Sequence, residues 1–183
     1  MSDYLRNFLR FWILVTIQVL LLNKISLRWW SYVSGHPIFL PYLYPLFILL
    51  LPFQTPVWLL LFLGMAMGLT VDAFMDTMGI HAMATVLIAY LRTNVLTALL
   101  PKNLAEYHNQ SPNVRVMGWF PFITYAAFLV FIHHLVFFLV EQWPFSNIGL
   151  VLLTVLASTV TTLLLVIAYL LLFTRQVGRA ETR

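Results

Sequence analysis

The sequence contains no cysteine. Disulfide bonds, thiolate catalysis and cysteine metal sites are therefore excluded, and nothing in the sequence indicates the redox compartment. Charged residues are also scarce, at 9% of the chain, whereas hydrophobic residues make up 62%. Because a soluble domain is about one-quarter charged and about half apolar, this composition indicates an integral membrane protein.

The motifs of several enzyme classes are missing too. The sequence has no HExxH, GxSxG or GxGD and no glycine-rich phosphate loop. His133 and His134 are adjacent, so on a helix their side chains point about 100° apart, which is poor geometry for two ligands of one metal. We expect no catalytic residue, no cofactor and no metal site. Nucleic acid is not needed to explain the basic residues, since membrane orientation and anionic lipid headgroups account for them.

Length and hydrophobic runs together predict the architecture. A membrane helix needs ~20 apolar residues, so 183 residues hold about six spans with short connections and no soluble domain. We predict a single all-α transmembrane domain over 1–183, with spans at about 8–23, 38–51, 57–74, 79–100, 119–140 and 148–173. The second span is short and contains Pro41 and Pro45, so a tilted, kinked or partly embedded helix is expected there.

The distribution of lysine and arginine predicts the orientation. Six spans would place both termini on one side of the membrane. That side would carry Arg6, Arg10, Arg92, Lys102, Arg115, Arg175, Arg179 and Arg183, and the other side only Lys24 and Arg28. Both termini are therefore expected in the cytoplasm. If the second span did not cross, every later span would be inverted and the basic loop at 101–117 would lie outside, which disfavours five spans.

Residues 64–92 are the expected functional region, because small residues, acids and a histidine interrupt the hydrocarbon there. Gly64, Gly68 and Asp72 lie four residues apart and so share one stripe of a helix. Such a stripe lets a neighbouring membrane helix approach closely. A second helix would begin after Gly79 with His81 in its first turn. We expect these five residues to form or support a partner-binding surface. Whether the stripe also joins two copies of the chain is left open.

Ionisable residues at membrane depth are candidates for function because burying them there is costly. Asp72 and Asp76 would share a face if their helix continued, and could then form a carboxylate dyad for acid–base chemistry. The alternative is that Asp76 lies in an outward-facing turn and that Asp72 is bonded to a neighbouring helix. One of His133 and His134 could meet Asp72 or His81 in a small polar network.

Four stretches carry a resemblance to a known family. They are QVLLLN at 18–23, PYLY followed by LLLP within 41–52, GLTVDAF at 68–74 and GIHAMATVLIAYLR at 79–92. Together they resemble the MreD family of bacterial rod-shape-determining membrane proteins, in the variety found in Bacteroidetes-type bacteria. The match covers about residues 10–92, and its most specific parts are GLxxD, GxHAxA and AYLR. No residue beyond Arg92 is matched to the family.

The resemblance implies a non-enzymatic component of the cell-elongation machinery in the bacterial inner membrane. Such a protein binds MreC and helps to couple MreB filaments to the peptidoglycan glycosyltransferase RodA and its transpeptidase partner. It also implies a fold similar to the substrate-binding component of energy-coupling-factor vitamin transporters. Two other hypotheses stay open: a small-molecule-binding subunit of a vitamin-type transporter, using Asp72, His81, His133 and His134, and an intramembrane hydrolase using Asp72 and Asp76.

Overall fold

A computed structural model describes residues 3–24, 32–33, 36–37, 39–107, 110–144 and 147–177 of the chain. Within these residues, five helices are long and apolar enough to cross a membrane, at Leu5–Leu22, Val57–Met75, Ile80–Leu99, Trp119–Glu141 and Ile148–Leu172. The chain is an all-α, multi-pass membrane protein, as its composition predicts. Arg28, Arg179 and Arg183 of the predicted orientation lie outside the described residues.

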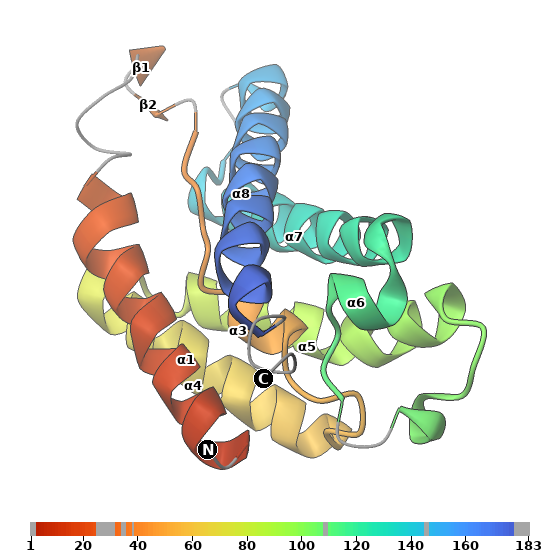
Figure 1. Cartoon of the computed structure of the whole chain (residues 1–183). Coiled ribbons are helices and arrows are strands. Elements are labelled where there is room, and N and C mark those ends of the chain that lie inside the picture. Colours follow the sequence, from red (N-terminus) through yellow and green to blue (C-terminus); the bar gives the residue numbers. More distant parts are fainter. Residues whose placement is uncertain are drawn as a thin grey trace.

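The helices follow one another with short connections (Figure 1). Helix α1 (Asp3–Thr16) continues as a π-helical turn (Ile17–Leu22), and a two-stranded antiparallel hairpin follows, β1 (Tyr32–Val33) with β2 (His36–Pro37). After the single turn α3 (Leu46–Leu49) come α4 (Val57–Met75) and α5 (Ile80–Leu99). A 3₁₀ turn (Leu104–Glu106) and α6 (Val114–Met117) then lead to α7 (Trp119–Glu141) and α8 (Ile148–Val177).

The predicted helix over 38–51 is wrong. Residues 39–43 form no helix, and only α3 is helical in this part of the chain. The two prolines explain the difference. Pro41 and Pro45 lack the N–H that a helix interior needs, and each disfavours helical geometry in the residue before it, Leu40 and Tyr44. We call residues 39–52 the inner segment.

The inner segment runs back along α1 in the opposite direction, between α1 and α8 (Figure 1). The Gln18 side chain in the π-helical turn bonds Pro41 and Leu43, whereas Arg10 on α1 bonds Leu50. Residues 41–51 are all buried. Extended chain rises about 3.3 Å per residue, so a short buried stretch carries the chain a long way back along the bundle.

Non-helical backbone at membrane depth is tolerated only where protein surrounds it and satisfies its polar groups. In the first half of the inner segment, side chains of the π-helical turn and of α8 do this. Leu40 N–H donates to Ser158 Oγ at 2.9 Å, Tyr42 N–H to Thr162 Oγ1 at 3.1 Å, and Leu43 N–H to Gln18 Oε1 at 2.8 Å. The Gln18 amide in turn donates to the Pro41 carbonyl at 3.2 Å.

Longer side chains satisfy the carbonyls of the second half. The Tyr125 hydroxyl of α7 donates to Leu49 O at 3.0 Å, and the Arg10 guanidinium donates to Leu50 O at 3.0 Å. Arg92 of α5 donates to the carbonyls of Leu51 and Pro52. Every long helix except α4 therefore contributes a polar side chain to the inner segment.

These contacts also place the turn after the inner segment and the 101–113 loop at one end of the molecule. Leu50 lies beside Arg10 near the start of α1, and Arg10 lies beside Tyr169 in the last part of α8. The turn after the inner segment meets the 101–113 loop there, since Phe53 N–H donates to Gln110 O at 2.9 Å. Six passes would give this arrangement if the inner segment crossed the membrane, and that crossing stays a prediction.

Helices α4 and α5 form a tightly packed hairpin, because glycines on α4 let α5 approach. A Cβ built on Gly68 would lie 2.3 Å from the Cα atom of Ala82 on α5. At Gly64 the corresponding contact is milder, 3.2 Å from the Ala89 Cβ. The hairpin turn contains two residues in the left-handed region, Asp76 with φ 55° and Gly79 with φ 81°.

The two glycines provide an internal comparison. We expect Gly68→Ala to lower the free energy of unfolding by about 3 kcal/mol or more, because the added methyl meets backbone that cannot move without separating the helices. Gly64→Ala should cost clearly less, about 1 kcal/mol, since the nearest atoms to the added methyl, Ala89 Cβ and Thr85 O, lie 3.2 and 3.3 Å away and need to move only slightly. Unfolding of the purified protein, followed by circular dichroism, measures both. Equal stability of Gly68→Ala and wild type would contradict this packing.

Candidate functional site

Asp72, in the last turn of α4, binds the beginning of α5. Its side chain is only 5% exposed. Oδ1 accepts from Thr77 Oγ1 at 2.5 Å and from the backbone N–H of His81 at 3.1 Å, and Oδ2 accepts from the N–H of Ala82 at 2.9 Å. A carboxylate in this position satisfies N–H groups that the helix leaves unpaired and complements the helix dipole. Asp72 therefore holds the hairpin closed.

Asp76 does not join Asp72 in a dyad. Helix α4 ends at Met75, and Asp76 takes up left-handed backbone geometry, which turns it out of the helix and leaves it exposed. This corresponds to the alternative in which Asp76 lies in a turn and Asp72 is bonded to a neighbouring helix. The structure thus offers no geometry for the hydrolase hypothesis at these two carboxylates.

Four of the five residues expected at a partner-binding surface lie in the interior of the bundle. Gly64, Gly68, Asp72 and His81 are buried, and α5 of the same chain covers the glycine stripe. The stripe itself is therefore not open to a partner or to a second copy, because the close approach that glycine allows is used within the hairpin. That these residues support a partner-binding surface from inside the bundle stays a prediction. Only Gly79 lies at the surface, half-buried in the turn, where an added methyl group would meet no atom within 4 Å.

The two histidines His81 and His133 meet through a third residue, Tyr44 of the inner segment. The Tyr44 hydroxyl lies 2.8 Å from His81 Nδ1 and 2.6 Å from His133 Nε2. All three side chains are fully buried. The predicted polar network thus exists, but the bridging group is a tyrosine and the carboxylate of Asp72 touches only the backbone of His81.

A single hydroxyl between two imidazoles has two arrangements. A tyrosine hydroxyl donates one hydrogen bond, so it donates to one ring and accepts from the N–H of the other. The opposite nitrogens, His81 Nε2 and His133 Nδ1, have no hydrogen-bond partner. In either arrangement the cluster therefore has one unpaired N–H and one unpaired acceptor nitrogen when both rings are neutral.

Tyr42 fills the remaining space around the histidines. Its ring is stacked at 5.5 Å on that of His134 and lies edge-on at 4.9 Å from that of His81. His134 itself bonds the Val130 carbonyl and lies 3.4 Å from the Thr162 hydroxyl. We name Tyr42, Tyr44, His81, His133 and His134 the tyrosine–histidine cluster. Among the described residues, no three histidine or acidic side chains are grouped to hold a metal ion.

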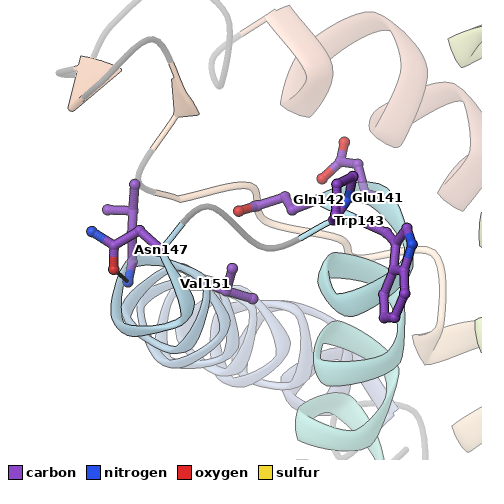
Figure 2. Close-up of a pocket in the computed structure, with 7 residues that line it drawn as sticks. Glu141, Gln142, Trp143, Asn147 and Val151 are labelled. Atoms are coloured by element: carbon purple, nitrogen blue, oxygen red, sulfur yellow. Dashed lines mark hydrogen bonds between the residues drawn. The ribbon is translucent and has the colours of Figure 1, made fainter.

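A separate hollow of about 220 Å³ lies at the turn between α7 and α8. Glu141, Gln142, Asn147 and Val151 help to line it, and Figure 2 shows the Glu141 carboxylate and the Trp143 ring pointing in different directions. Small-molecule sites are typically ~300–1,000 Å³ with convergent polar groups. This hollow is smaller, and its charged and aromatic groups do not surround a common point.

No family model, curated protein or solved structure matches this chain. The MreD resemblance therefore rests on the motifs of residues 10–92 alone, and the function it implies is a proposal.

Sequence reasoning did not single out Tyr42, Tyr44 or Gln18 as important side chains. The signal for the tyrosines is the PYLYP stretch at 41–45. Prolines at both ends favour extended chain, and in extended chain residues two apart point to the same side. Gln18 could have been noticed as a lone polar residue in the apolar run of the first span, since such a group needs a partner at membrane depth.

The bridging role of Tyr44 can be measured directly. We expect Tyr44→Phe to lower the free energy of unfolding by about 1–3 kcal/mol, because it leaves two further buried ring nitrogens unpaired. In a double-mutant cycle with His133→Phe, the two losses should be non-additive by about 1 kcal/mol. The control Tyr90→Phe, on the exposed face of α5, should be neutral. Additive losses would show that the hydroxyl does not couple to His133.

Proposed function

We propose that this protein is a non-enzymatic scaffold of the cell-elongation machinery in the bacterial inner membrane, with both termini in the cytoplasm. In this proposal it binds MreC in the membrane and helps to couple MreB filaments to RodA and its transpeptidase partner. The motifs shared with the MreD family supply the identity of the partners. The structure contributes a reason why a protein of this kind acts through its surface.

One observation carries the proposal. Several polar side chains at membrane depth bind other parts of the same chain. Asp72 binds the start of α5, Arg92 and Gln18 bind the inner segment, and Tyr44 joins His81 to His133. Groups held in this way maintain the shape of the bundle. The surfaces that remain for function are then the outward helix faces and the loops.

The outward face of α4 is the proposed partner surface, because large apolar side chains are exposed there and lie about 110° around the helix from the glycines. Trp58, Phe62, Met65 and Leu69 are spaced by four, three and four residues and so form one stripe. They are 68%, 63%, 47% and 50% exposed. In lipid, such a stripe associates with another helix through packing rather than through burial from water.

Crosslinking in living cells tests this surface. A photoreactive amino acid at Phe62 should capture MreC. The same amino acid at Leu164 of α8, which is 62% exposed against 63% for Phe62, should capture only lipid. Equal exposure makes the pair a matched comparison of the two faces. Capture of no membrane protein at Phe62, or the same proteins at both positions, would contradict the proposal.

The small-molecule-binding subunit is the second candidate. It is favoured by the convergence of His81, His133 and His134 with two unpaired ring nitrogens. Tyr42 and Tyr44 fill the space between these rings, so a ligand would have to displace them. Thermal stabilisation of the purified protein by a vitamin-type compound would favour this candidate over the scaffold.

A further inference from the structure

The two halves of the inner segment are held by different kinds of bond. In the second half, two of the three donors are the guanidinium groups of Arg10 and Arg92. Hydrogen bonds from charged donors are roughly twice as strong as neutral ones. This half also contains α3, whose own backbone bonds stabilise it. Residues 46–52 are therefore firmly attached to α1, α5 and α7.

The first half, residues 39–43, is attached to the helices around it through neutral side chains, and its backbone bond from the Leu46 N–H to the Leu43 carbonyl is local. Three of its N–H groups, those of Leu40, Tyr42 and Leu43, bond Ser158, Thr162 and Gln18 respectively. Within the described residues, no backbone group of a neighbouring helix bonds residues 40–42. Two of the three acceptors lie four residues apart on α8, so one face of one helix holds most of this stretch.

The hydroxyls on α8 differ in what they bind. Thr154 and Thr161 donate to the carbonyls of Leu150 and Ala157, four residues earlier in their own helix. Ser158 and Thr162 instead accept from the inner segment. The helix thus offers two hydroxyls that hold residues 39–43 and two of similar chemistry that do not.

We propose that residues 39–43 form a strap that α8 holds in place and that opens about Pro45, while residues 46–52 stay fixed. Opening withdraws the Tyr42 ring from the rings of His81 and His134. It therefore exposes the tyrosine–histidine cluster from the side of the bundle where α1 ends. The strap is a conformational device, distinct from the partner surface on α4.

The absence of cysteine allows labelling at single introduced cysteines in the purified full-length protein. Leu43→Cys reports on the strap, and Leu49→Cys on the fixed half. These side chains are 6% and 0% exposed. Each is combined with Ser158→Ala plus Thr162→Val, which removes both α8 acceptors, or with the control Thr154→Val plus Thr161→Val. The reaction rate with a soluble maleimide is measured.

We expect the Ser158→Ala, Thr162→Val pair to raise the labelling rate at position 43 by about tenfold or more, because it leaves two buried N–H groups unpaired. The rate at position 49 should not change, and the control pair should leave both rates within about twofold. An unchanged rate at position 43 would overturn the proposal. So would an equal rise at position 49, since the inner segment would then open as one unit.

If the Ser158→Ala, Thr162→Val protein does not fold, hydrogen exchange of the unaltered chain gives the same test. The amides of Leu40, Tyr42 and Leu43 should exchange at least about tenfold faster than those of Phe47 and Ile48, which bond the carbonyls of Tyr44 and Pro45. Equal protection of the two groups would overturn the strap.

Discussion

The fold depends on one requirement: buried backbone that is not helical must have every polar group paired. In hydrocarbon an unpaired N–H or C=O costs several kcal/mol, so extended chain cannot cross a membrane alone. Side chains from α1, the π-helical turn, α5, α7 and α8 pair many of the polar groups of the inner segment. Its three prolines, Pro41, Pro45 and Pro52, reduce the requirement further, because they have no N–H to pair. The bundle is thus assembled around a stretch that its own helices must support.

This requirement gives the polar residues of the spans a structural meaning. Isolated polar residues interrupt the apolar helices in the sequence, and each of three forms a hydrogen bond to the backbone of the inner segment: Gln18, Arg92 and Thr162. The same holds for the hairpin, where Asp72 pairs the N–H groups at the start of α5. A membrane protein with few polar residues can use nearly all of them to maintain its shape. Its interactions with other molecules then depend on the outward faces of that shape.

Much of the fold could be predicted from the sequence, because long apolar runs determine it. The five long helices lie where hydropathy places them. The second span could not be recognised as extended, since its apolar composition is that of a helix and its partners Ser158 and Thr162 are more than a hundred residues away. Spacing likewise predicts that a helix approaches the glycine stripe, but it does not indicate which helix. The role of Tyr44 cannot be predicted from the sequence, because it depends on two histidines from different helices, His81 and His133.

The most direct test of this account is the stability of Gln18→Leu. The substitution keeps the size of the side chain and removes its two bonds, leaving Leu43 N–H and Pro41 C=O unpaired. Gln54→Leu is the matched control, because Gln54 is exposed and donates a single bond to Ala105 O. The account predicts that Gln18→Leu lowers the free energy of unfolding by roughly 2–4 kcal/mol and that Gln54→Leu changes it by about 0.5 kcal/mol or less. Equal stability of the two variants would contradict it.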